Sequence, residues 1–144
     1  MKLELKHLAP YLPYKLKAEM LDYKIDYVGR QYDEIIGLHQ WDKSGTLWCV
    51  FTDGGSKPSL NDIKPILKSL QKFDQDEFFK LQDFIGLGNW CDAYDEYFTA
   101  WFDDAANVDK LILQAPYKVI QFFFLEHYDV FGLIDAGLAV ELKD

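Results

Sequence analysis

The sequence predicts an α+β fold in which an N-terminal antiparallel sheet packs against C-terminal helices. Two observations support this fold class. Apolar and polar residues alternate in the first half of the 144-residue chain, whereas apolar residues recur at helical spacing in the second half. Residues 53–58, which hold two glycines and a proline, separate the two patterns. The length fits a single globular domain, residues 1–144, that buries its own core.

Strands are predicted where period-two patterning is bounded by turn residues. The predicted strands lie at residues 16–20, 23–27, 34–41, 46–52 and 138–142. The first two fit one long strand or a tight hairpin. The next two are joined by Asp42, Lys43, Ser44 and Gly45, which have the turn chemistry of a hairpin. The last is expected to return to the N-terminal sheet.

Helices are predicted in the second half from apolar spacing and from capping residues. The predicted helices lie at residues 63–70, 75–85, 90–106 and 116–128. Pro65 limits the first of them to a short helix that begins near the proline. Asp74 and Glu77 have the spacing of a capping box at the start of the second. Pro116 suits the first turn of the last helix, whose apolar residues surround its axis and place Phe123 in the core.

The segment 90–106 has the clearest helical pattern in the chain. Its aromatic residues fall within an arc of about 100° when successive residues are placed about 100° apart. They are Trp90, Tyr94, Tyr97, Phe98 and Trp101, followed by Ala105. The opposite side carries Asp92, Glu96, Thr99 and Asp103. The pattern predicts a buried aromatic face, with Trp101 in the core, and a row of carboxylates exposed to solvent.

The same region holds most of the charge imbalance of the chain. Residues 81–109 contain no lysine or arginine and account for -7 of the formal net charge of -9. Their seven carboxylates are Asp83, Asp92, Asp95, Glu96, Asp103, Asp104 and Asp109. A concentrated field of one sign attracts cationic surfaces and repels nucleic acid and anionic membranes. We therefore expect a basic protein partner and no direct binding to nucleic acid or membrane.

Other kinds of site have weaker support. Cys49 and Cys91 are expected to be buried free thiols, since two cysteines without metal-ligand spacing form neither a disulfide framework nor a zinc site. His127, beside Glu126, is either a proton carrier or, more often for such a residue, a structural histidine. Asp92, Glu96 and Asp103 fit a solvated helix face better than a metal site. Neither a cofactor nor a metal is predicted, and the reducing cytoplasm is the expected setting.

Three segments of the chain resemble a family of small proteins of Bacteroidetes phages and prophages. The segments are MKLELKHLAPYLPYKLK at residues 1–17, IKPILKSL at 63–70 and APYKVIQFFFLEHYDVFGLIDAGLAVEL at 115–142. The acidic segment 81–109 departs from the family pattern. The resemblance implies a mobile-element origin and a place in the cytoplasm of an infected or lysogenic bacterial cell. It implies no particular activity and carries no catalytic residues to this chain.

Together these observations favour a non-enzymatic phage-type protein that binds and modulates or inhibits a host protein. The partner would present a basic surface, as a nucleic-acid-processing defence enzyme such as a CRISPR effector does. The predicted binding residues are Asp92, Asp95, Glu96, Asp103 and Asp104. Three alternatives stay open: an acidic segment that only keeps the protein soluble, a small enzyme whose site combines sequence-distant residues, and a phage structural or assembly protein.

Overall fold

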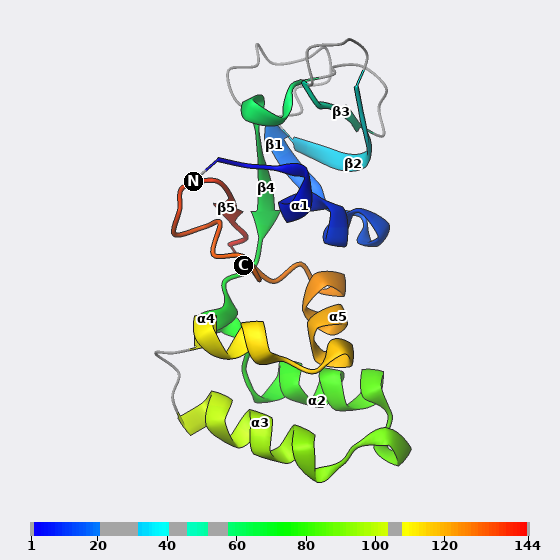
Figure 1. Ribbon diagram of the computed structural model, residues 1–144, viewed down its shortest axis with the longest axis vertical. Coiled ribbons are helices and arrows are strands. Elements are labelled where there is room, and N and C mark those ends of the chain that lie inside the picture. Colours follow the sequence, from blue (N-terminus) through cyan, green and yellow to red (C-terminus); the bar gives the residue numbers. More distant parts are fainter. Residues whose placement is uncertain (1, 21–31, 41–45, 52–57, 104–107, 144) are drawn as a thin grey trace.

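The computed structural model describes residues 2–20, 32–40, 46–51, 58–103 and 108–143. The strands lie at one end of the molecule and the helices α2, α3, α4 and α5 at the other (Figure 1). In chain order the elements, with η for 3-10 turns, are α1 (Leu5–Leu8), η1 (Ala9–Tyr14), β1 (Lys17–Met20), β2 (Tyr32–His39), β3 (Trp48–Phe51), η2 (Leu60–Asp62), β4 (Ile63–Leu67), η3 (Leu70–Lys72), α2 (Gln75–Ile85), η4 (Leu87–Asn89), α3 (Asp92–Asp103), α4 (Val108–Leu111), η6 (Ile112–Gln114), α5 (Tyr117–Leu125) and β5 (Val140–Glu141). The predicted α+β fold class is confirmed.

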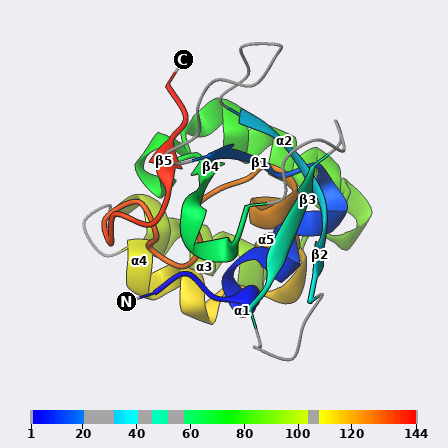
Figure 2. The ribbon, with the colours of Figure 1, turned by 90° about the horizontal axis from the view of Figure 1, so that it is seen from above.

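The five strands form one mixed sheet in the order β3-β2-β1-β4-β5. The pairs β3–β2, β2–β1 and β1–β4 are antiparallel, whereas β5 pairs in parallel with β4. The antiparallel pairing of β2 with β3 agrees with the predicted hairpin, although its turn residues 42–45 lie outside the described part, as does the strand expected at 23–27. Seen from the sheet end, β5 lies beside β4 (Figure 2). The predicted return of the final strand to the sheet is therefore confirmed.

The helix predicted at residues 63–70 is wrong, because this segment forms the strand β4 and the turn η3. Ile63, Pro65 and Leu67 are buried and alternate with half-buried neighbours, so the segment has strand periodicity as well as helical spacing. Proline is normally excluded from a central strand because it lacks an N–H donor. Here β5 pairs only with Ile66 and Leu67, which follow the proline. On the edge of β4 that faces away from β1, no described strand therefore pairs with Pro65.

The N-terminal residues form the short helix α1 and the turn η1, which the sequence patterns did not predict. At the start of α1, His7 Nδ1 accepts a hydrogen bond of 3.0 Å from the backbone of Glu4. The aromatic ring of Tyr11 in η1 is fully buried and meets Phe124 of α5 edge to face at 4.9 Å. These elements therefore close the core on the side of the sheet that faces α5.

The predicted helix boundaries near residues 74 and 86 are confirmed, whereas α5 ends earlier than expected. Asp74 accepts a 3.0 Å hydrogen bond from Glu77 N at the start of α2, and Gly86, with φ of +85°, follows its end. Helix α5 was expected to reach residue 128 but stops at Leu125. His127 has φ of +61°, a left-handed conformation that no continuing α-helix allows.

The buried apolar residues form two clusters. The cluster under the sheet is mainly aliphatic and includes Leu8, Leu16, Ile35, Leu67 and Leu133. The cluster among the helices is rich in rings and includes Phe73, Phe98, Trp101, Phe122, Phe123 and Tyr128. Phe123 is fully buried and Trp101 is 2% exposed, so both predicted core positions are confirmed. Phe124 packs against both clusters and connects them.

Hydrogen bonds also join the two ends of the molecule. The Tyr11 hydroxyl donates to the Tyr128 carbonyl at 2.6 Å and accepts from Val130 N at 3.1 Å. The backbone of Lys68, which follows β4, donates to the His127 carbonyl and accepts from Asp129 N, both at 2.8 Å. Because most of these groups are buried, the bonds satisfy polar atoms that water does not reach.

Candidate protein-binding face on α3

Helix α3 is amphipathic as predicted. Phe98 and Trp101 are buried, and Tyr94 and Tyr97 are half-buried. The structure places four of the five predicted binding residues on the solvent side of this helix. They are Asp92, Asp95, Glu96 and Asp103, which together we call the acidic face. Asp104, the fifth, lies outside the described residues.

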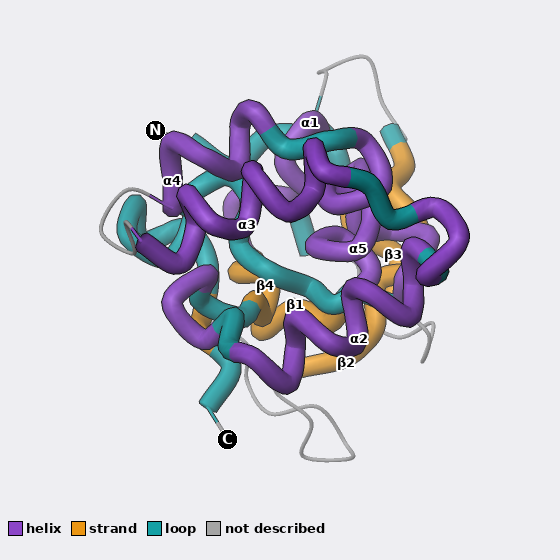
Figure 3. Tube along the Cα trace, turned by 90° about the horizontal axis from the view of Figure 1, so that it is seen from below, coloured by secondary structure: helices purple, strands orange, loops and turns teal. Residues whose placement is uncertain are grey.

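The acidic face lies at the end of the molecule farthest from the sheet (Figure 1). The view from below shows α3 and α2 side by side at this end, joined through η4 (Figure 3). Beneath α3, Trp101 stacks on Phe123 with ring centroids 5.4 Å apart, and Phe98 stacks on Phe73 at 5.8 Å. Large rings packed in this way fix the helix that carries the carboxylates.

The spacing of the carboxylates follows from the geometry of the helix. Eleven residues separate Asp92 from Asp103, which corresponds to about 16 Å along the helix axis. Four carboxylates over this length have a mean axial spacing of about 5 to 6 Å, which is wider than the value of about 3.4 Å for one strand of duplex DNA. The acidic face therefore presents the same sign of charge as a phosphate backbone, at a lower linear density.

The stability of the helix explains only part of this arrangement. Asp92 and Asp95 lie in the first turn, where negative charge interacts favourably with the helix dipole. Asp103 lies in the last turn, where the same charge is unfavourable. Asp92 and Glu96 are four residues apart, and like charges at that spacing cost a few tenths of a kcal/mol. Glu96 and Asp103 thus reduce helix stability, and a role in binding would account for their presence.

Asp95 is held in place by its neighbours. Trp90 Nε1 donates a 2.8 Å hydrogen bond to Asp95 Oδ1, and the Thr99 hydroxyl donates to the Asp95 carbonyl at 2.8 Å. The Trp90 ring is itself fixed, because it stacks on Tyr94 at 4.9 Å and meets Phe78 edge to face at 5.6 Å. The sequence placed Asp95 on the helix but gave no signal for this contact.

A groove of about 340 Å³ runs between α2 and α3. It is lined by Gln75 and Phe78 from α2 and by Asp95, Phe98, Thr99 and Phe102 from α3. Phe102 is 38% exposed, so part of its ring is accessible to solvent at the groove. The groove therefore combines an aromatic floor with a carboxylate at its rim.

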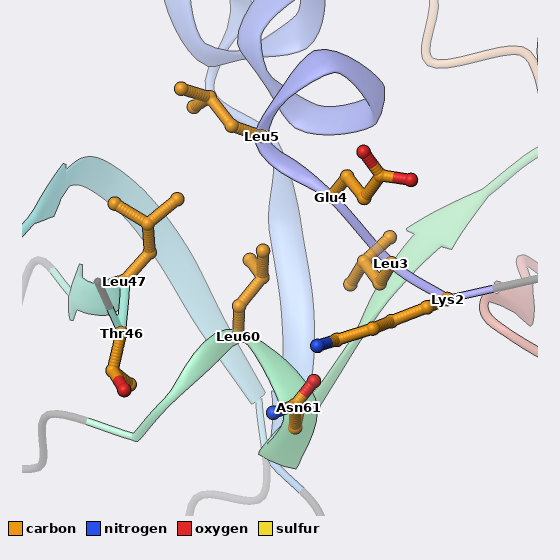
Figure 4. Close-up of a pocket in the computed structure, with 8 residues that line it drawn as sticks. All are labelled: Lys2, Leu3, Glu4, Leu5, Thr46, Leu47, Leu60 and Asn61. Carbon is orange, nitrogen blue, oxygen red and sulfur yellow. The ribbon is translucent and has the colours of Figure 1, made fainter. Parts of the chain in front are cut away.

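A larger cavity, of about 440 Å³, lies at the opposite end of the molecule between the N-terminal segment and the sheet. Leu3, Leu47 and Leu60 converge on it, and the Lys2 side chain extends toward Asn61 (Figure 4). Its polar side chains come from Lys2, Glu4, Thr46 and Asn61. They include neither a histidine nor a cysteine, and they do not form a recognisable catalytic set.

A third cavity, of about 390 Å³, is lined by charged residues at the junction of β4, α2 and the C-terminal segment. Lys68 pairs with Glu126 at 3.3 Å, and Lys72 donates to the Leu142 carbonyl at 2.8 Å. Glu77 pairs with Lys80 at 2.7 Å. Most of these charges have partners within the fold and hold the segments together, whereas the buried Glu77 Oε2 has no hydrogen-bond partner among the described residues.

The cysteines and His127 do not form a site. Cys49 is buried as predicted, and burial raises the pKa of its thiol to about 12, which disfavours the reactive thiolate. The prediction that Cys91 is buried is wrong, because this residue is exposed before the first turn of α3. A ring nitrogen of His127 is hydrogen-bonded to the Tyr14 carbonyl, which ties the end of α5 to η1.

Within the described ranges, no group of three or more histidine, cysteine, aspartate or glutamate residues is arranged to hold a metal ion. Over the same part of the chain, none of the helices has both the length and the apolar character needed to cross a membrane.

Comparison of the chain with models of known protein families, with curated proteins and with solved structures finds no match.

Proposed function

We propose that this protein is a non-enzymatic binding protein whose acidic face on α3 binds a basic surface of another protein. The observation that supports this most directly is the exposure of Asp92, Asp95, Glu96 and Asp103 on one helix, above a packed aromatic layer. No lysine or arginine occurs between residues 81 and 109 to neutralise them within the segment. Complementary charge of this kind speeds encounter and selects the partner.

The proposed partner is a host protein that normally binds nucleic acid. A row of four exposed carboxylates on one helix presents negative charge that suits a channel built to hold phosphates. The resemblance of three segments to Bacteroidetes phage and prophage proteins supports a bacterial host as the setting. On this proposal the protein modulates or inhibits a nucleic-acid-processing defence enzyme, of which CRISPR effectors are one class.

Affinity capture from bacterial lysate tests this proposal when two variants of equal charge are compared with the wild type. The first variant combines Asp92→Lys, Glu96→Lys and Asp103→Lys, and we expect it to lose the partner. The second combines Asp62→Lys, Asp76→Lys and Asp135→Lys, three exposed positions outside α3, and we expect it to keep the partner. Thermal denaturation checks that both variants fold.

The complex should also depend on salt in a defined way. Exposed charges are screened over about 8 to 10 Å at physiological ionic strength, so added salt should reduce the association rate more than it raises the dissociation rate. Equal loss of partner from both charge variants would show that net charge matters and the place of the charge does not. Retention by a folded α3 variant would refute binding through the acidic face.

A further inference from the structure

The groove between α2 and α3 combines an aromatic surface with a carboxylate. Phe78, Phe98 and Phe102 form its floor, and Asp95, Thr99 and Gln75 form its polar edge. Phe78 meets Phe98 at 5.1 Å and Phe102 at 5.6 Å, both edge to face, so the rings are packed against one another. Its volume of about 340 Å³ lies at the lower end of the range of about 300 to 1,000 Å³ that is typical of ligand sites.

Asp95 is positioned to take part in binding at this groove. Its Oδ1 accepts the hydrogen bond from Trp90 Nε1, which fixes the carboxylate without neutralising it. An ionised carboxylate can accept about four hydrogen bonds, so most of its capacity is left for a ligand. The residue is exposed, so a donor from solution can reach it. The side chain therefore needs little reordering to bind a cation.

We infer that this groove receives an arginine side chain of the basic partner. This inference rests on the proposed function, since it specifies the residue type that the acidic face recognises. The guanidinium would donate to the Asp95 carboxylate, and its planar face would lie against the exposed ring of Phe102. The remaining carboxylates of the acidic face would attract the rest of the basic surface.

Arginine fits this combination better than lysine does. A guanidinium is planar, presents several N–H donors in a fixed geometry and stacks on aromatic rings. The lysine ammonium is compact and strongly hydrated, so it gains less from a ring and from a paired carboxylate. An apolar side chain would fill the floor but leave Asp95 without a counter-charge. Charge complementarity therefore favours a cation, and the ring favours the guanidinium.

Two peptides of equal charge provide the test, one of nine arginines and one of nine lysines. Their affinities for the full chain are measured by calorimetry at low salt, and the Trp90 indole N–H is followed by NMR after assignment with Trp90→Phe. We expect the arginine peptide to bind about tenfold more tightly and to shift the Trp90 signal, because Trp90 donates to Asp95. Phe102→Leu and Asp95→Asn should each remove this preference.

The matched control is Phe79→Leu, which removes an exposed ring from α2 that does not line the groove. This variant should keep the preference for arginine. Equal affinity of the two peptides for the wild type, or equal effects of the Phe102 and Phe79 variants, would refute arginine binding in the groove. Neither result would refute binding of a basic surface by the acidic face. Failure of both peptides to bind at low salt would also refute the proposal that the acidic face binds a basic surface.

Discussion

The sheet end and the helical end of the molecule are built from different side chains. Under the sheet the buried residues are mostly leucine, isoleucine and alanine, whereas between the helices nearly half of them are phenylalanine, tryptophan or tyrosine. The two ends also differ in surface charge, because the acidic face lies at the helical end. The part of the molecule with the largest rings is therefore also the part with the most concentrated charge.

This difference indicates how a small domain can expose a row of like charges on a stable helix. Repulsion among the carboxylates destabilises α3, whereas burial of Phe98 and Trp101 stabilises it. Burying a large aromatic side chain contributes several kcal/mol, whereas each like-charge pair costs a few tenths. The aromatic cluster therefore outweighs the electrostatic cost by about an order of magnitude.

The largest expected effect comes from removing a ring at the centre of the helical cluster. Phe123 is fully buried and contacts Phe73, Trp101 and Tyr128 at centroid distances of 5.1 to 5.4 Å. Phe123→Ala should lower the free energy of unfolding by about 3 to 5 kcal/mol, measured by urea denaturation. Leu67→Ala, at a fully buried site of the aliphatic cluster, should cost about 2 to 5 kcal/mol and provides the comparison.

Trp101 gives a second measurement on the same cluster. Trp101→Ala should also cost about 3 to 5 kcal/mol, and because its ring stacks on Phe123 the double variant should not be additive. Pairing Phe123→Ala with Leu67→Ala should give a smaller coupling. Additive losses at Phe123 and Trp101 would mean that the rings do not act as a unit.

The connection between the two ends can be weakened at one hydroxyl. Tyr11→Phe removes a group that bonds both the Tyr128 carbonyl and Val130 N, and it leaves those buried atoms only their 2.9 Å hydrogen bond to each other. We expect a loss of about 1 to 3 kcal/mol in the free energy of unfolding. Tyr97→Phe removes a hydroxyl that bonds Leu111 within the helical end and serves as the control. A Tyr97 effect as large as that of Tyr11 would argue against a special role for the junction.

The junction should also respond to pH through Asp129. Its carboxylate accepts 2.8 Å hydrogen bonds from Leu133 N and Ile134 N, and Asp129→Ala should cost about 1 to 3 kcal/mol. Burial raises the pKa of this carboxyl above its ordinary value, although the two backbone N–H groups act in the opposite direction. The folded state therefore binds a proton more readily than the unfolded state does.

It follows that the stability contribution of Asp129 increases as the pH falls through its raised pKa. The wild type should gain stability relative to Asp129→Asn as the pH falls from neutral toward the ordinary aspartate pKa of about 4, as measured by urea denaturation at each pH. A difference that is independent of pH, or one that changes in the opposite direction, would contradict the raised pKa.

The smallest expected effect concerns the acidic face itself. Asp103→Lys replaces a carboxylate in the last turn of α3 with a charge that the helix dipole favours. We expect the free energy of unfolding to rise by a few tenths of a kcal/mol, detectable as a small increase in Tm. Asp92→Lys, in the first turn, should be less stable than Asp103→Lys, because the dipole there opposes a positive charge and offsets the relief of repulsion with Glu96. A Tm of Asp92→Lys equal to or above that of Asp103→Lys would show that the helix dipole does not decide the stability of these variants.

The elements that were predicted correctly depend on local patterns. The amphipathic character of α3, the cap at Asp74 and the strand alternation around Leu16 and Ala18 follow from residues close in sequence. The strand β4 was missed because Ile63, Leu67 and Leu70 satisfy helical spacing, and only pairing with β1 and β5 decides between the two structures. Such pairing is a tertiary effect that overrides local propensity.

The candidate site likewise has some features that follow from local sequence and others that depend on the folded structure. The exposure of Asp92, Glu96 and Asp103 follows from their spacing on one helix, which the sequence contains. The groove depends on how α2 lies against α3, and the hydrogen bond from Trp90 to Asp95 depends on the turn that joins them. The role of Asp129 as an acceptor for the following turn also requires the folded backbone. These features arise from geometry that no short motif encodes.

The parallel pairing of β4 with β5 has a consequence for the order in which the chain folds during synthesis. Ile66 and Leu67 pair with Val140 and Glu141, and the whole helical end lies between them in the sequence. A ribosome delivers β4 long before β5, so one edge of the strand stays unpaired while the helices are made. Contacts between such distant residues slow folding because a long loop must close first. The sheet of this protein is therefore completed last, by residues that follow the helices.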